Sequence, residues 1–533
     1  MKTTPVKFAV LALLAAAALR ADVKPSTLFS DHVVLQRDMP VPVWGTAAAG
    51  EPVTVAFAGQ TKATTAGADG KWRVDLAPLT ASAEGRVLTI SGADPAKAVT
   101  CADVLVGEVW ICSGQSNMDF TVSKAVASFA GIANEAEEIA AAHYPLIREF
   151  RGRPDRIAEP QANVTATWKV CSPETVPAFS AVAYIFARQL QKDIKVPVGL
   201  LTLTFGASTA QAWVRREALA ADPELIPLLD AFDAKMEAFR NAPATPAPAA
   251  TPPAAAPAAG VAQNAGTPNA AGGAAARGAR AGRAARGPSS PATDQHNPTV
   301  LYNGLIAPVV PYAVRGVIWY QGESITGSLP QFAKLNATLI NDWRTLWGRP
   351  SGATGVVPFP FYFVQLAGLA NSGSNRPEVR EAQTAALTLP DTGMAVATDI
   401  GEANAVHPKN KQDVGDRLAR IALANTYGRK IEFSGPVYDA MKVEGGAIRV
   451  TFTHLGGGLV AKGNAPLKWF SVAGADQKFV PAEAKIVGDT VVVSSPGVPA
   501  PVAVRYAWER FPDGCNLFNA AGLPAPQFRT DKW

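Results

Sequence analysis

Cysteine and histidine are both scarce in this chain. Four cysteines and five histidines are spread over 533 residues, and no Cys-x-x-Cys pair occurs. A structural zinc site is therefore not expected, and so few cysteines do not make a disulfide-dependent scaffold. A Gly-x-Ser-x-Gly motif is also missing, which argues against the α/β-hydrolase class of esterases.

Excess positive charge is confined to two segments of the chain. The formal net charge is +5, but Lys2, Lys7 and Arg20 lie at the N-terminus. Four more cations lie in a tract rich in glycine and alanine, namely Arg277, Arg280, Arg283 and Arg286. Without these residues the chain is slightly acidic and offers no basic stripe for phosphate contacts. We therefore expect no nucleic-acid partner.

The N-terminus is typical of a secretory signal peptide. Two lysines precede an apolar run over residues 8–19, and small residues follow up to residue 21,. The apolar run is too short to span a bilayer. We expect a signal peptide at 1–21, a mature chain without a transmembrane segment, and a secreted or periplasmic protein in which one or two disulfides could form.

Hydrophobic patterning divides the mature chain into three parts. Residues 22–100 alternate apolar and polar side chains between tight turns, which predicts an N-terminal β-sandwich module,. Over 101–431, buried-strand patterns alternate with helical ones, which predicts a parallel, three-layer α/β domain. Within it, Ala, Pro and Gly dominate 242–296, where we expect a disordered insertion,. Alternation returns over 432–533, which predicts a C-terminal β-rich domain.

The strongest chemical signal is an apolar strand pattern that ends at glycine and then delivers a serine. Residues 110–118 read Trp-Ile-Cys-Ser-Gly-Gln-Ser-Asn-Met. A hydroxyl at such a turn stands clear of its own backbone, and ligands of parallel α/β sheets bind at the carboxyl ends of the strands. Ser116 is therefore the first candidate nucleophile.

His407 is the best placed of the five histidines to act as a base. It follows a strand pattern and a loop, it precedes a proline and a helical pattern, and it lies in the same predicted domain as Ser116,. A capping or core histidine is the alternative role for this residue. The other four lie in the β-rich parts, in a helical pattern or beside the Ala/Pro/Gly tract: His32, His143, His296 and His454.

Two further segments place polar groups beside glycine where a buried strand ends. Residues 205–208 read Phe-Gly-Ala-Ser, and residues 319–324 read Trp-Tyr-Gln-Gly-Glu-Ser. Either segment could present a backbone N–H or a side-chain amide to an oxyanion. A tight turn without a catalytic role is the alternative for each.

Taken together, three blocks resemble the sialate O-acetylesterase family of SGNH hydrolases. The blocks are residues 114–118, 319–324 and 407–411, the last of which reads His-Pro-Lys-Asn-Lys. The similarity extends over nearly the whole mature chain, with shorter matching segments at residues 34–36, 69–72, 301–304 and 528–531.

The resemblance implies a flavodoxin-like hydrolase core with flanking β domains that removes O-acetyl groups from sugars. It implies that Ser116 is the nucleophile and His407 the general base. The N–H of Ser116, a backbone N–H near Gly206 and the Gln321 amide would form the oxyanion hole. The implied chemistry needs no metal and no organic cofactor.

The chain departs from the family pattern at two positions of the predicted site. Relatives often have a Gly-Gly pair where this chain has Gly206 and Ala207, and a methyl group restricts the backbone angles there,. SGNH enzymes generally place Asp three residues before the histidine, a position that Asn404 occupies here.

The carboxylate that would orient His407 must therefore come from elsewhere. Asp399, at the end of the preceding strand pattern, is the first candidate, and Glu402 and Glu323 are the alternatives,. A salt bridge or a helix cap is an equally good role for any one of them. A Ser-His pair without an acid would still turn over, but more slowly.

These inferences predict a secreted carbohydrate O-acetylesterase that forms an acyl-enzyme on Ser116. Its partner would be an acetylated carbohydrate, either sialic acid or a xylan-type glycan. One alternative is a carbohydrate-binding protein with a weakened hydrolase core, although Ser116, His407 and Gln321 are all retained. Another is a lipid or short-chain esterase, although no apolar lid is apparent. The sequence carries no signal for an oligomeric state.

Overall fold

The computed structural model describes residues 22–127, 129–153, 156–242, 289–348, 359–371 and 375–533. The expected signal peptide at 1–21 and most of the expected insertion at 242–296 lie outside these residues. The described end of that insertion forms a 3₁₀ turn, η4 (Pro291–Thr293), in which Ala292 is buried. No helix in the described ranges is long and apolar enough to cross a membrane.

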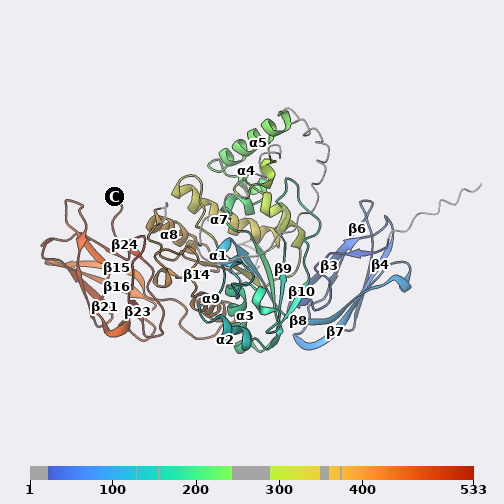
Figure 1. The fold of residues 1–533 in the computed structure, drawn as a ribbon, viewed down its shortest axis with the longest axis horizontal. Helices are drawn as coiled ribbons and strands as arrows, with labels where there is room; N and C mark the ends of the chain where they lie inside the picture. The colour runs from blue at the N-terminus through green and yellow to red at the C-terminus, as the bar shows by residue number, and fades with distance from the viewer. Residues whose placement is uncertain (1–21, 128, 154–155, 243–288, 349–358, 372–374) are drawn as a thin grey trace, which may run out of the picture.

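A mixed α/β domain with a large, mainly parallel sheet lies at the centre of the molecule (Figure 1). Its central strands are wholly buried, as expected for a sheet that helices cover on both faces,. Antiparallel β10 (Trp168–Cys171) forms one edge. The parallel strands follow in the order β9 (Tyr144–Arg151), β11 (Val198–Thr204), β8 (Val99–Gly114), β12 (Gly316–Tyr320), β13 (Phe361–Val364) and β14 (Thr392–Ala395).

Helices cover both faces of this sheet (Figure 1). On one face α3 (Ala181–Ile194) packs against α9 (Gln412–Asn425), and on the other α7 (Leu329–Leu346) packs against α8 (Arg376–Thr384). The Ser180 hydroxyl caps α3 by accepting a hydrogen bond from the Ala183 N–H,. The shorter or peripheral helices are α1 (Ser116–Asp119), α2 (Glu135–Ala140), α4 (Arg216–Ala220) and α5 (Ile226–Asn241).

Strand β8 connects the N-terminal β-rich part to the central sheet. Its first half pairs with β2 and β7, and its second half pairs with β11 and β12. One apolar core runs through both parts without interruption. The other strands of this part are β1 (Lys24–Pro25), β2 (Val34–Gln36), β3 (Val41–Thr46), β4 (Pro52–Phe57), β5 (Gln60–Thr65), β6 (Lys71–Leu76) and β7 (Ser82–Ser91).

The C-terminal part is also β-rich and has an apolar core of its own. It is tied to α8 by the buried Arg380, whose guanidinium donates to the carbonyls of Glu509 and Arg510 and to the side chain of Gln527. Its strands are β15 (Val437–Glu444), β16 (Ala447–Thr453), β17 (Leu459–Ala461), β18 (Phe470–Ala473), β19 (Val480–Pro481), β20 (Glu483–Val487), β21 (Thr490–Ser494), β22 (Ala503–Tyr506), β23 (Leu517–Asn519) and β24 (Phe528–Arg529).

All four cysteines are buried thiols that are not joined in disulfides. Burial raises the pKa of the Cys101 and Cys171 thiols to about 12, so these side chains are inert apolar groups rather than nucleophiles,. The bridges that export would allow are not formed in this structure.

Candidate active site

Ser116 lies where the central strand of the sheet ends. Strand β8 stops at Gly114, which has φ +132°, and a Cβ there would lie 2.2 Å from the carbonyl oxygen of Tyr320. Only glycine fits this close approach of two backbones. The chain then bends through Gln115, and Ser116 opens helix α1. The serine therefore sits between the ends of β11 and β12, where the strand order reverses and α/β folds bind ligands,.

Gln115 joins this turn to the loop after β12. Its side-chain oxygen accepts hydrogen bonds from the N–H groups of Gly322, at 3.2 Å, and Ser324, at 3.4 Å. Gln115 is almost completely buried. The segment 319–324 therefore holds the nucleophile's turn in place through its backbone.

The structure brings Ser116 and His407 together across 291 residues of sequence. The Ser116 Oγ and the His407 Nε2 lie 2.7 Å apart, within hydrogen-bonding distance. The imidazole is half-buried and packs beside Phe129, with ring centroids 5.0 Å apart, and Phe120, at 6.4 Å. Burial, with a contribution from the nearby Lys411 charge, lowers the pKa of His407, so the ring is neutral and able to accept a proton at neutral pH,.

Lys411 and Asn117 form a buried polar link beneath this pair. The Lys411 Nζ donates to the Asn117 Oδ1 at 2.6 Å and lies 4.5 Å from the centroid of the Phe120 ring. The Asn117 Nδ2 in turn donates to the carbonyl of Val406, the residue before His407, at 3.0 Å. Burial lowers the pKa of Lys411 to about 7. The link thus joins the helix that carries the nucleophile to the loop that carries the base.

Sequence reasoning did not single out Lys411 or Asn117. Asn117 directly follows Ser116, and Lys411 lies four residues after His407. Both residues therefore lie within the segments that carry the family resemblance. A lysine in an otherwise polar segment gives no sign that it will be buried. Only the position of Lys411 in the motif could have marked it as a functional residue.

The structure does not bring Asp399 to His407. Asp399 lies in η8 (Thr398–Ile400), and both of its carboxylate oxygens lie 2.7 Å from the guanidinium of Arg417 on α9. Both side chains are almost fully buried. A bidentate ion pair of this kind occupies the carboxylate, so in this structure Asp399 stabilises the fold of the loop rather than orienting the imidazole.

The two alternative carboxylates are engaged elsewhere as well. Glu402 accepts a hydrogen bond from the backbone N–H of Lys409 at 2.7 Å. Glu323 forms a buried ion pair with Arg376, and burial raises its pKa. Across the described ranges, the only hydrogen bond of the His407 ring is the one to Ser116. The described part of the chain therefore presents a Ser-His pair without an orienting acid.

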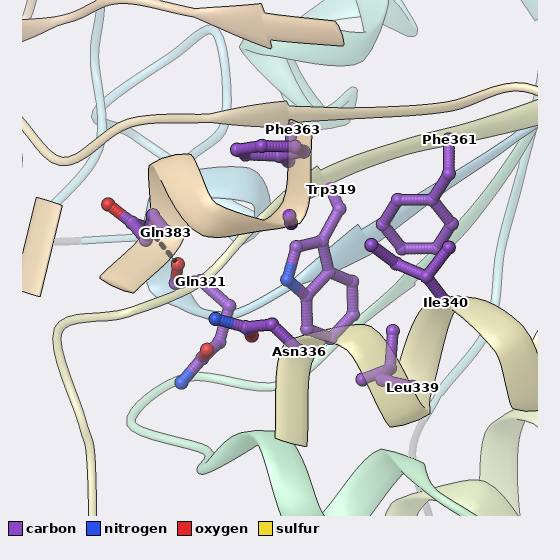
Figure 2. Close-up of a pocket in the computed structure, with 9 residues that line it drawn as sticks. Trp319, Gln321, Asn336, Leu339, Ile340, Phe361, Phe363 and Gln383 are labelled. Carbon is purple, nitrogen blue, oxygen red and sulfur yellow. Dashed lines mark hydrogen bonds between the residues drawn. The ribbon is translucent and has the colours of Figure 1, made fainter. Parts of the chain in front are cut away.

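Gln321 is also committed to the protein interior. Its Nε2 donates to the carbonyls of Ser208, at 3.2 Å, and Ser324, at 2.8 Å, so neither N–H is directed at Ser116. Figure 2 shows Gln321 beside Trp319, Asn336 and Gln383 at a small internal cavity of about 10 Å³. The Gln321 amide thus ties two loops of the site together instead of facing the nucleophile.

The backbone after β11 lies directly against Ser116. A Cβ built on Gly206 would be 3.7 Å from the Ser116 Cβ. Ala207 follows with φ +54°, in the left-handed region that glycine adopts more easily than alanine,. Within the described ranges, neither N–H donates to another protein group. These N–H groups are therefore available to an oxyanion.

A cavity of about 760 Å³ opens in front of the Ser-His pair. Its lining includes Ser116, His407 and Ala207 together with the ion-paired Glu323 and Arg376. Among the described residues, no three His, Cys, Asp or Glu side chains lie close enough to form a metal site.

The sequence relatives of this chain share one named activity. No protein-family model matches the chain. The sialate O-acetylesterase of Rattus norvegicus is 27% identical over 559 residues, covering 94% of this chain and 93% of its own. That of Homo sapiens is 26% identical over 457 residues, covering 80% of this chain and 75% of its own.

A solved structure agrees with these sequence relatives. A carbohydrate acetylesterase from Xanthomonas citri superposes with a TM-score of 0.76 at 32% identity, covering 96% of this chain and all of its own. The resemblance seen in the sequence is thereby confirmed. The chain is a carboxylic ester hydrolase and belongs to the sialate O-acetylesterase family of carbohydrate esterases.

Proposed function

We propose that this protein is a secreted carbohydrate O-acetylesterase with a flavodoxin-like SGNH core. The observation that carries the proposal is the 2.7 Å contact between Ser116 Oγ and His407 Nε2, at the end of the central strand of the sheet. A neutral imidazole beside a serine hydroxyl at a strand end is the arrangement that acyl transfer requires.

The reaction proceeds in two halves. Ser116 Oγ attacks the acetyl carbonyl carbon while His407 Nε2 accepts the hydroxyl proton, and the tetrahedral oxyanion then collapses. The C–O bond to the sugar breaks, and the sugar oxygen takes the proton from His407. Water then attacks the acetyl-enzyme, with the same histidine as base, and acetate leaves. This mechanism requires neither a metal nor an organic cofactor.

The backbone supplies the oxyanion hole in this proposal. The N–H groups of Ser116, Gly206 and Ala207 would donate to the oxyanion, since the backbone at Gly206 lies against Ser116, while the Gln321 amide holds the flanking loops,. His407 is oriented by packing on Phe129 and by the tie from Asn117 to the carbonyl before it, in place of a carboxylate.

The polar part of the lining of the catalytic cavity supports the substrate class. Beside the catalytic pair and apolar residues such as Leu329, Leu369 and Val379, the lining includes Glu323, Arg376, Asn371 and Asn375. Such polar groups match the hydroxyls of an acetylated sugar, either O-acetyl sialic acid or an acetylated xylan-type glycan.

Acetate release from 4-nitrophenyl acetate, acetylated xylan and O-acetyl sialic acid tests the proposal. Ser116→Ala and His407→Ala should each lower kcat by about 1,000-fold or more. His454→Ala, which removes a histidine of the C-terminal part, is the matched control and should retain wild-type rates. Undiminished release by Ser116→Ala would sink the mechanism. Sugar binding by a wild-type protein that hydrolyses none of the three would favour the weakened, carbohydrate-binding alternative.

Secretion is tested on the exported protein. N-terminal sequencing of material recovered from the periplasm or the medium should find a start near Asp22. An intact Met1 on exported protein would contradict the proposed signal peptide.

A further inference from the structure

We propose that a second cavity, on the Gly206 side of Ser116, is a binding subsite for the sugar residues that neighbour the acetylated one. This cavity has a volume of about 840 Å³ and lies at the carboxyl ends of β9 and β11. The inference rests on the proposed esterase function, and it adds that the enzyme acts on internal residues of an oligosaccharide or polysaccharide.

The β9–β11 cavity begins at the catalytic pair itself. Gly206 lines it, and the backbone of that residue lies against Ser116. Phe129 also lines it, and the Phe129 ring packs beside His407 at a centroid distance of 5.0 Å. Ser116, His407 and Ala207 line the catalytic cavity. The two cavities therefore meet the site at adjacent residues, Gly206 and Ala207.

The size of these cavities exceeds what the acyl group needs. An acetyl group presents one carbonyl and one methyl to the enzyme, so it occupies only a small part of cavities of about 760 Å³ and 840 Å³. Both cavities therefore have room for the alcohol part of the ester. An alcohol that extends from the acetylated sugar into both cavities is an internal residue of a glycan chain.

The polar part of the lining favours a sugar over a longer acyl chain. Beside apolar residues such as Phe179 and Phe205, the β9–β11 cavity is lined by threonines and charged groups, which include Thr165, Thr167, Lys169 and Arg153. An alkyl chain would remove water from these groups without replacing their hydrogen bonds. Sugar hydroxyls would replace those bonds.

One aromatic platform and one fixed polar group complete the subsite. Phe129 is 38% exposed, although it is a large apolar residue beside the active site. Such a ring can cover the C–H face of a pyranose. Arg151 is held in place because its guanidinium donates to the Asp119 carbonyl at 2.7 Å, while Thr204 Oγ1 donates to the Asp119 carboxylate at 2.6 Å.

The test is to block the cavity at its far end, away from the reacting atoms. Thr167 is exposed on the rim, so Thr167→Trp fills the cavity without disturbing the core. Thr61→Trp, at an exposed position of β5, is the matched control. The substrates are 4-nitrophenyl acetate and acetylated xylo-oligosaccharides of two to six residues, measured as separate kcat and KM values.

For the wild-type enzyme and the Thr61→Trp control, kcat/KM should rise with oligosaccharide length. Thr167→Trp should abolish this rise by increasing KM about tenfold for the longer substrates, and its rate on 4-nitrophenyl acetate should stay within twofold. Phe129→Ala should lower kcat/KM more for the hexasaccharide than for the disaccharide.

Two results would overturn the inference and leave the esterase function intact. One is a wild-type kcat/KM that does not depend on oligosaccharide length. The other is a selective loss of 4-nitrophenyl octanoate hydrolysis in Thr167→Trp, which would make the cavity an acyl-chain site. Absence of hydrolysis of every acetyl ester would instead overturn the proposed function itself.

Discussion

Lys411 donates a hydrogen bond of 2.6 Å from its ammonium group to the side-chain oxygen of Asn117, the residue next to the nucleophile. Asn117 also holds the carbonyl before His407. One buried cation therefore influences both catalytic residues, since it fixes their relative position through Asn117 and acts on His407 through its charge. In a site without an orienting carboxylate, this link is the main polar constraint on the base.

Replacing Lys411 by methionine should shift the pH dependence of the reaction. His407 must be neutral to act as a base, and its pKa is lowered by burial and by the Lys411 charge. Below its own pKa of about 7, Lys411 is protonated and opposes protonation of the imidazole,. Without this charge the pKa of His407 rises, so the acid limb of kcat/KM should move to higher pH.

The same variant should lower the plateau kcat about tenfold, because the Asn117 side-chain oxygen loses its donor,. Lys409→Met changes an exposed lysine of the same loop and should not shift the acid limb of the kcat/KM profile. An acid limb of Lys411→Met that stays in place, or moves to lower pH, would contradict the electrostatic role.

Asp399→Asn should affect stability more than turnover. The change leaves the buried Arg417 guanidinium without its counter-charge, and breaking a buried pair in this way costs about 3–5 kcal/mol,. The imidazole does not contact Asp399, so kcat of the folded enzyme should stay within about tenfold. Urea unfolding at fixed pH and initial rates measure the two effects.

Asp413→Asn provides the matched control for that experiment. Asp413 also lies near Arg417, at 3.6 Å, but it is substantially exposed, and its loss should cost little,. A fall in kcat by orders of magnitude in Asp399→Asn with unchanged stability would show that Asp399 acts on the base after all.

Gln321→Glu should separate a loop-anchoring role from an oxyanion role. The carboxylate cannot donate to the carbonyls of Ser208 and Ser324, so we expect a loss of about 2–4 kcal/mol in the free energy of unfolding,. If Gln321 bound the oxyanion, kcat would instead fall by about 100- to 1,000-fold with little change in stability. Gln331→Glu, at a half-buried glutamine whose side chain also donates to a carbonyl, is the control.

Ala207→Gly should stabilise the protein slightly. Ala207 has φ +54°, which is unfavourable for a residue with a Cβ, and glycine relieves this strain at some cost in unfolded-state entropy,. We expect a net gain of about 0.5–1 kcal/mol in urea unfolding. Ala58→Gly tests the same effect at an exposed turn with φ +50°. A loss of stability in Ala207→Gly alone would mean that its methyl group contributes packing.

Local sequence patterns determined which segments form strands and where the nucleophile is presented. The glycine at 114 ends β8 because no side chain fits against Tyr320, and this requirement is visible as a Gly before the serine motif. Apolar runs predicted the buried strands of the central sheet, since a parallel sheet covered on both faces needs them. The family resemblance further pointed to His407, although 291 residues separate it from Ser116.

Only the tertiary structure decided which partner each polar side chain takes. Asp399 was a plausible partner for His407 by position, but a guanidinium on α9 offers two hydrogen bonds and a charge, and it binds both carboxylate oxygens,. The Gln321 donors are likewise taken by two nearby carbonyls. Strand formation depends on residues a few positions apart, whereas such partners are chosen by competition among groups that folding brings together from distant parts of the chain.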